Sequence, residues 1–305
     1  MSILEVKHPD LHDLIAPDSQ IERVAGGLAF TEGPVWCGDC LFFSDIPNRR
    51  IVRWRSLPEG PELTTFAKGM YPNGLTLDRQ GRVLAADGRR VTRVEADGTR
   101  TILVDKFQGK RLNSPNDIVA RSDGSVYFTD PPFGIQPAKA GSSMSRPAGW
   151  WGLPLPGKQL SCNGVYRIAP DGILHLVADD CALPNGLAFS PDESVLYVDD
   201  SAHKHIRAYD MHADGTLTNS RILLDMASED PGVPDGLKVD LQGNIFCTGP
   251  GGIWVCRSDG ELLGRIIAPE LPANLAWGED GSALFLTART SVYRLRTRTR
   301  GMLLR

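Results

Sequence analysis

The sequence predicts an all-β chain that folds as a six-bladed β-propeller. Six times, an acidic or amide residue precedes a strand-like run, a tight turn and a second strand-like run. Successive repeats begin roughly 40–50 residues apart, except across one longer gap, and this spacing is about the length of a four-stranded blade. The 32 Gly and 22 Pro also suit many short strands joined by turns better than long helices.

Each repeat supplies one polar residue at the start of its first strand-like run, which we call its anchor. The six anchors are Glu32, Asn73, Asn116, Asn185, Asp235 and Asn274. Turn signals such as Ser122-Asp123-Gly124 and Glu279-Asp280-Gly281 separate the two runs of a repeat. Because the innermost strands of a propeller all start near the axis at one face, we expect the anchors to converge there.

We expect residues 1–305 to form a single propeller domain whose two ends pair. The segments 21–24 and 291–295 both resemble strands, and pairing them would remove an exposed strand edge. The longer gap is a loop insertion at about 131–162 in the third blade, rich in Pro, Gly and Ser, with Trp150-Trp151 in its second half. We interpret it as a loop over the mouth of the central channel, and a surface loop without a role is the alternative.

Composition excludes several classes of partner. The net charge is -4, and no cluster of Lys and Arg interleaves with aromatic residues, so nucleic acid is not an expected partner. The first twenty residues lack the apolar core of a signal peptide, and no apolar run approaches ~20 residues. We therefore expect a soluble, cytoplasmic protein with no membrane contact, in an oligomeric state that remains open.

The six cysteines are scattered along the chain, which predicts free thiols rather than a disulfide framework. One pair, in Cys37-Gly38-Asp39-Cys40, has the spacing of a redox or zinc motif. Gly38-Asp39 is also a good two-residue hairpin turn, and no second pair of cysteines or histidines accompanies it. We favour the hairpin.

The anchors predict a metal site made of oxygen ligands. Glu32 and Asp235 would repel each other in a narrow channel unless a cation neutralised them. For Asn73 and Asn274, a simple turn role is an equal alternative. With no histidine at any anchor, Ca²⁺, Mg²⁺ or Mn²⁺ fits better than structural Zn²⁺, although bound Zn²⁺ stays open. Two carboxylates and one divalent ion would leave a neutral site suited to an uncharged polyhydroxylated substrate.

Other polar residues are weaker candidates. His203 and His205 alternate along a strand-like run, which favours the outer face of a blade. Most of the aspartates that end second strand-like runs are expected to cap turns. They are Asp45, Asp87, Asp130 and Asp199 or Asp200. No G-x-S-x-G motif occurs, so nothing supports a serine hydrolase.

Five motifs in order, at the spacing of blades, resemble one protein family. They are Glu32-Gly33-Pro34-Val35-Trp36, Ser114-Pro115-Asn116-Asp117, Pro184-Asn185-Gly186-Leu187, Pro234-Asp235-Gly236 and the run from Leu286 to Tyr293. This pattern is similar to that of the senescence marker protein, gluconolactonase and luciferin-regenerating enzyme family, and segment 111–117 is similar to its gluconolactonase-type branch. The resemblance implies that Glu32, Asn185 and Asp235 bind the metal, with Asn116 as a further ligand or a substrate contact. It also implies that Arg111 and Asn113 contact substrate.

Together these observations predict a metal-dependent hydrolase that opens a sugar lactone of the gluconolactone type. The metal would polarise the lactone carbonyl and hold the attacking water, while Asp235, or else Glu32, removes a proton from that water. Asn73 would join the substrate contacts. A metal-dependent esterase or phosphotriesterase at the same site is the nearer alternative, and a non-catalytic propeller that binds a ligand or partner is the more distant one.

Overall fold

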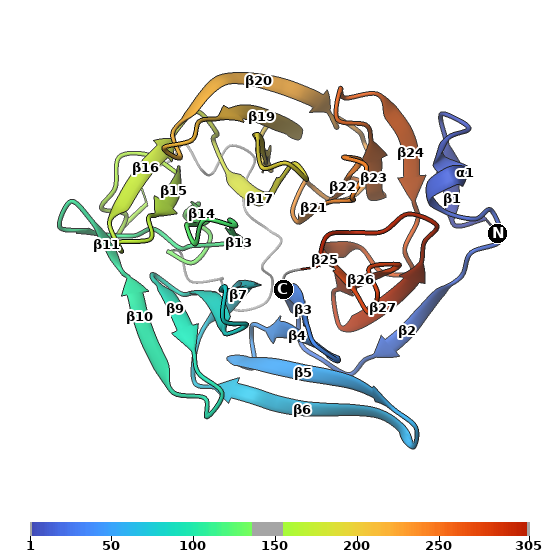
Figure 1. Cartoon of the computed structure of the whole chain (residues 1–305), viewed down its shortest axis with the longest axis horizontal. Helices are drawn as coiled ribbons and strands as arrows, with labels where there is room; N and C mark the ends of the chain where they lie inside the picture. Colours follow the sequence, from blue (N-terminus) through green and yellow to red (C-terminus); the bar gives the residue numbers. More distant parts are fainter. Residues whose placement is uncertain (1, 136–154, 304–305) are drawn as a thin grey trace.

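In the computed structural model, which describes residues 2–135 and 155–303, six antiparallel sheets surround a central axis (Figure 1). We number these blades 1 to 6 along the chain. Blades 1–4 and 6 have four strands each, and blade 5 has five. The predicted six-bladed β-propeller is therefore confirmed.

Each blade runs from an innermost strand at the axis to an outer strand at the rim. The innermost strands are β3 (Thr31–Cys37), β7 (Pro72–Leu77), β13 (Ile118–Ala120), β17 (Pro184–Phe189), β21 (Leu237–Val239) and β25 (Pro272–Gly278). The second strands are β4 (Cys40–Asp45), β8 (Val83–Asp87), β14 (Val126–Asp130), β18 (Val195–Asp200), β22 (Ile245–Gly249) and β26 (Ala283–Ala288). Neighbouring innermost strands contact one another around the ring.

The outer half of each blade is formed by a third and a fourth strand. The third strands are β5 (Arg50–Leu57), β9 (Val91–Val94), β15 (Gly164–Ile168), β19 (His205–Met211), β23 (Gly252–Cys256) and β27 (Ser291–Arg296). The fourth strands are β6 (Gly60–Lys68), β10 (Arg100–Val104), β16 (Leu174–Ala178), β20 (Leu217–Asp225), β24 (Leu262–Ile266) and β2 (Ile21–Ala25). A two-stranded hairpin, β11 (Lys106–Phe107) and β12 (Lys110–Arg111), follows blade 2.

The two ends of the chain close the ring. Strand β2 pairs antiparallel with β27, with Ile21 opposite Leu295 and Glu22 opposite Arg294. The N-terminal strand therefore completes blade 6, as predicted. Strand β1 (Leu4–Val6) adds a fifth strand to blade 5 through β24, and helix α1 (Leu11–Leu14) buries Leu11 and Leu14 beside it. The edges of β27 and β24 are thereby paired within the chain, which leaves neither strand open to a second chain.

The hydrophobic core lies between the faces of neighbouring blades. Trp36 of blade 1 stacks on Phe285 of blade 6, with ring centroids 5.3 Å apart. A comparable apolar layer joins blades 1 and 2, where Phe42 and Ile51 pack with Leu75. Because both faces of these sheets are covered, the second strands are buried along most of their length, and this packing fixes where the inner strands start.

The insertion leaves β14 and returns at β15. Residues 136–154, which include Trp150-Trp151, lie outside the described residues, so the predicted loop over the channel mouth stays a prediction. Cys37 and Cys40 face each other across the β3–β4 hairpin, and all six cysteines are free. Within residues 2–135 and 155–303, no helix is long and apolar enough to span a membrane.

Candidate active site on the propeller axis

The anchors lie where the innermost strands depart from regular pairing. The register of β3 on β4 shifts between Glu32 and Val35, and similar shifts occur next to Asn73, Asn185 and Asn274. A β-bulge bends its strand and re-aims a side chain. In blades 3 and 5, the innermost strand begins only after its anchor. The six polar side chains are therefore released from the ladder and available to the axis.

Glycines beside the anchors let adjacent blades approach closely. A Cβ atom at Gly33 would lie 2.0 Å from the carbonyl oxygen of Asn73, and one at Gly186 would lie 2.2 Å from the carbonyl oxygen of Asp235. No side chain fits in either place. The anchor-glycine pair, present in four of the six repeats, thus brings these anchors against the next blade, as the convergence argument requires.

The anchors form a connected set of polar groups. The amide of Asn73 donates to Oδ1 of Asn116, and the amide of Asn116 donates to Oδ1 of Asn185. Asn185 in turn donates to Oγ of Ser201 at 2.9 Å. The structure therefore brings together amides from blades 2, 3 and 4, as predicted.

The two predicted carboxylates join this set from the other side. The amide of Asn274 donates to Oε2 of Glu32 at 3.0 Å, and Asp235 contacts both Glu32 and Asn185 through its carboxyl group. Burial, followed by repulsion from Asp117, raises the pKa of Glu32 to about 7. Burial, followed by repulsion from Glu32, raises the pKa of Asp235 well above its usual range.

Two further carboxylates at the axis were missed by the sequence analysis. Asp117 is buried and accepts from the amide of Asn274 at 3.4 Å, and it lies 3.8 Å from the ammonium group of Lys238. Asp199 is fully buried, and burial together with repulsion from Asp235 raises its pKa well above its usual range. The axis therefore holds four carboxylates, not the two that the anchors predicted.

Both missed residues break a pattern within the repeats. Asp117 stands next to its anchor, where four of the other repeats have glycine. Asp199 is the second-to-last residue of its strand, where the other second strands have Ser, Thr or Ala. A charged residue in place of a small one at an inner position was the available signal.

The remaining aspartates of the second strands cap turns, as expected. Asp45 accepts from the backbone amide of Ala29 at 3.1 Å, and Asp130 accepts from that of Ser114 at 2.7 Å. Asp87 and Asp200 make the same kind of contact with the segments that precede β7 and β17. These bonds fix each inner strand to its neighbour, so they position the anchors without adding to the axial set.

The chemistry of the axial set fits a hard divalent cation. Glu32, Asp235 and the amides of Asn116 and Asn185 offer oxygen donors that already lie in one cluster, in which all but Asp235 are buried. One oxygen of Asp199 is buried and has no hydrogen-bond partner among the described residues. Among the described residues, Lys238 alone pairs with one of the four axial carboxylates, and a cation would relieve the excess of negative charge when these groups ionise. Oxygen ligands of this kind favour Ca²⁺, Mg²⁺ or Mn²⁺.

A cavity of about 670 Å³ adjoins the axis and could hold a substrate. Asn73 and Arg111 both line it, together with Arg89 and Phe133. Its volume lies within the usual range of ~300–1,000 Å³ for small-molecule sites. Because Asn73 also bonds to Asn116, the cavity meets the axial set through this one amide. The structure therefore places the predicted substrate contacts Asn73 and Arg111 in a common cavity.

Asn113 lies apart from the axial set. Its side chain is fully buried and donates to the backbone oxygens of Asp130 and Cys162, each at 3.0 Å. These bonds hold the segment before blade 3 against the two ends of the insertion. Substrate contact by Asn113 stays a prediction, and the hydrogen bonds give it a structural role in addition.

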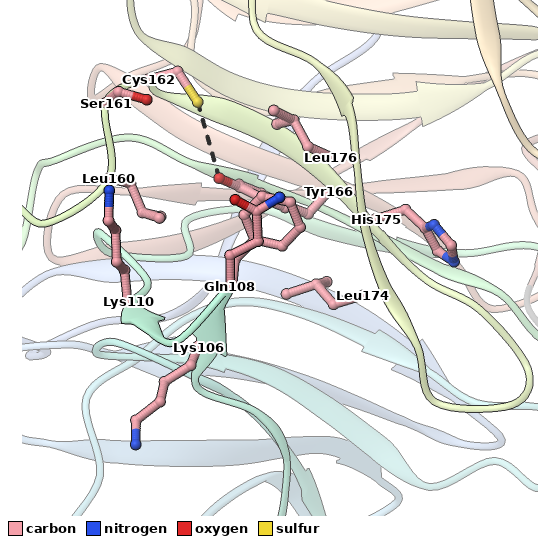
Figure 2. Close-up of a pocket in the computed structure, with 11 residues that line it drawn as sticks. Lys106, Gln108, Lys110, Leu160, Ser161, Cys162, Tyr166, Leu174, His175 and Leu176 are labelled. Atoms are coloured by element: carbon pink, nitrogen blue, oxygen red, sulfur yellow. Dashed lines mark hydrogen bonds between the residues drawn. The ribbon is translucent and has the colours of Figure 1, made fainter.

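A second cavity of about 670 Å³ lies away from the axis, between the β11–β12 hairpin and the outer strands of blade 3 (Figure 2). Lys106, Lys110 and His175 lie at its border, and Tyr166 contacts Cys162 within it. None of the predicted site residues lines this cavity. The two cavities have the same volume, so size does not select between them. Only the first is lined by an anchor, Asn73, and so adjoins the axial set.

The raised pKa of Glu32 predicts how the cation-free protein responds to pH. Unfolded Glu32 loses its proton near pH 4.5, whereas folded Glu32 keeps it to about pH 7. The folded state therefore binds more protons in this window, and its free energy of unfolding falls as pH rises from 4.5 to 7. Denaturant unfolding of chelator-treated protein at pH 5 and pH 8 measures this loss, with Glu32→Gln as the control. We expect the loss to be smaller in Glu32→Gln, and an equal loss would contradict the assignment to Glu32.

Comparisons with known proteins add an independent observation. A family model described as SMP-30/Gluconolactonase/LRE-like region matches residues 30–290. A gluconolactonase of Zymomonas mobilis subsp. mobilis is 35% identical over 318 residues, which cover 96% of this chain and 85% of that protein.

Solved structures also resemble this chain over nearly its whole length. A gluconolactonase from Xanthomonas campestris is 34% identical, covers 96% of this chain and 94% of its own, and superposes with a TM-score of 0.83. The calcium-binding protein regucalcin from Agrobacterium tumefaciens is 18% identical, covers 92% of this chain and 95% of its own, and has a TM-score of 0.74. At this low identity, the similarity to regucalcin supports the fold alone.

Proposed function

Because the chain belongs to the SMP-30/gluconolactonase/LRE-like family, as its motifs predicted, we propose that it hydrolyses a sugar lactone at one divalent cation on the propeller axis. The observation that carries this proposal is the contact between the carboxyl groups of Glu32 and Asp235 beside the amide series Asn73, Asn116 and Asn185. An all-oxygen set of this kind, open to a neighbouring cavity, is what a cation-assisted ester hydrolase requires.

Glu32, Asn185 and Asp235 would hold the cation, with Asn116 as a fourth ligand. When bound, a divalent cation would polarise the lactone carbonyl and keep the neighbouring carboxylates ionised. Asn185 is fixed by Ser201, which donates to the carbonyl oxygen of Pro234 at 2.6 Å. This bond ties the ligand of blade 4 to the segment that carries Asp235, so two ligands are positioned together.

Asp235 would act as the general base. In the cation-free protein, burial and repulsion from Glu32 raise the pKa of its carboxyl group, so its carboxylate has a higher proton affinity than an exposed aspartate and is the stronger base. Glu32 is the second candidate, since the same environment raises its pKa to about 7. One of the two would take a proton from the attacking water while the other balances the positive charge.

The charge balance of the site supports an uncharged substrate. Lys238 balances Asp117, and the raised pKa of Asp199 favours its neutral form. Glu32 and Asp235 then remain to balance one divalent cation. A polyhydroxylated lactone would meet hydrogen-bonding groups such as Asn73 and Arg111 in the adjoining cavity.

The test compares substrates under one cation. Aldonolactones should be hydrolysed with a kcat/KM at least tens of times that of phenyl acetate or a paraoxon-like phosphotriester. A site that pairs with hydroxyl groups rejects analogues without them by as much as ~10⁴–10⁵, because its own polar groups are left unpaired. The assay uses the same loaded protein for all three substrate classes. A reversed order would reject the lactone while leaving the cation site in place, and no turnover of any ester would reject the proposal as a whole.

A further inference from the structure

A second group of possible metal ligands lies outside the axial set, in the turn from β18 to β19. Asp200 ends β18, His203 lies in the turn, and His205 begins β19. Each offers a ligand atom, and these atoms all lie within 4.8 Å of one another. Nδ1 of His203 is 2.9 Å from Oδ2 of Asp200, and the two imidazole rings stack with centroids 5.7 Å apart. The expected outer-face position is wrong for His205, which is buried.

Asp200 is a fixed, ionised carboxylate. It is fully buried, yet backbone amides donate to it from Ala182 at 2.8 Å, Leu183 at 3.1 Å and Ala202 at 2.9 Å. Burial raises its pKa, but these hydrogen bonds outweigh burial, so the net pKa is lowered. Within the described residues, its one ion-pair partner is His203.

His205 supplies an unpartnered donor or acceptor beside this carboxylate. Its side chain is 8% exposed, and its Nε2 is buried without a hydrogen-bond partner in the described part of the chain. A buried polar atom that lacks a partner costs ~1–3 kcal/mol. An ion bound by Nε2 of His205 would remove that cost. His203 is the most accessible member, because 57% of its side chain is exposed.

We propose that Asp200, His203 and His205 form a second cation site, selective for Zn²⁺ or a similar transition-metal ion. Two imidazoles and one carboxylate are typical Zn²⁺ ligands, and three protein ligands leave a fourth position for water. Ca²⁺ and Mg²⁺ prefer oxygen ligands and would not compete well for two nitrogens. The chain would then carry two cation sites with opposite preferences.

The two sites are linked through three consecutive residues. Asp199 faces the axial carboxylates, Asp200 is the proposed ligand, and Ser201 accepts from the amide of Asn185 at 2.9 Å. An ion held by Asp200 would stiffen the turn that carries Ser201. The proposal does not depend on lactone hydrolysis, since none of its three ligands belongs to the axial set.

Cobalt is the probe that separates the two sites. Four- or five-coordinate Co²⁺ with nitrogen ligands absorbs visible light strongly, whereas six-coordinate Co²⁺ with oxygen ligands absorbs weakly. Co²⁺ is titrated into the full-length protein with excess Ca²⁺ present to fill the axial site. We expect a strong visible band that saturates at one equivalent of Co²⁺ per protein and disappears when Zn²⁺ is added. His203→Ala and His205→Ala should both lose the band and weaken Zn²⁺ binding at least ~10–100-fold, the loss that even outer-shell changes cause.

His175→Ala is the matched control, because His175 is an exposed histidine on β16 and should leave the band unchanged. Circular dichroism shows whether each variant folds. If His205→Ala does not fold, the His203→Ala variant decides the test, because His203 is exposed. The proposal is overturned if the wild-type protein gives no strong band, if His203→Ala keeps both the band and the Zn²⁺ affinity, or if a thiolate charge-transfer band shows that cysteine binds the ion instead.

Discussion

Asp235→Asn is expected to lower kcat for lactone hydrolysis by ~10²–10⁴-fold, the usual contribution of a general base. Asparagine keeps the volume of the side chain and one oxygen ligand but accepts no proton from water. Because Asp235 contacts Glu32 and Asn185, the change also removes one of two repelling carboxylates, so the fold should survive. Steady-state kinetics under saturating Ca²⁺, with bound cation measured by elemental analysis, gives the result.

The control for Asp235→Asn is Asp240→Asn, the same change at a fully buried carboxylate outside the axial set. Asp240 accepts from the backbone amides of Gln242 and Asn244, so this variant should lose stability and keep its kcat. An unchanged kcat in folded, cation-loaded Asp235→Asn would mean that another group is the base. Asp199→Asn then becomes the decisive variant, since Asp199 is the carboxylate that faces Asp235 from blade 4.

The ring of blades and the positions of the anchors could be predicted from the sequence because both are periodic. Glu32 and Asp235 lie about two hundred residues apart, yet the six-fold repeat alone placed both at the start of an innermost strand. The closing pair β2 and β27 followed from the same reasoning, since a ring with unpaired ends would expose an edge.

The missed residues fall where periodicity carries no information. Asp117 and Asp199 replace small residues within the repeats, and their approach to the axis depends on how closely adjacent blades pack. For Asn113, a neighbouring motif suggested substrate contact, whereas its hydrogen bonds to Asp130 and Cys162 depend on the path of the insertion. His205 looked like an outer residue because alternation identifies the face of a strand but not what covers that face.

Removal of divalent cations should abolish lactone hydrolysis. A Lewis acid contributes several kcal/mol to transition-state stabilisation, and at ~1.4 kcal/mol per tenfold change in rate this means a loss of ~10²–10³-fold or more. Chelator treatment also leaves the carboxyl groups of Glu32 and Asp235 in contact without the divalent counter-charge, so Tm should fall together with activity. Activity and thermal unfolding are measured on the same chelated sample, which elemental analysis shows to be free of metal.

Adding back single cations then identifies the site that matters for catalysis. Ca²⁺, Mg²⁺ or Mn²⁺ alone should restore both activity and Tm, because the axial ligands are oxygens. His203→Ala should recover equally with these ions, since the proposed second site contributes no ligand to the axis. Full activity in metal-free protein would contradict the cation mechanism. Recovery with Zn²⁺ alone, lost in His203→Ala, would instead move catalysis from the axial carboxylates to the turn between β18 and β19.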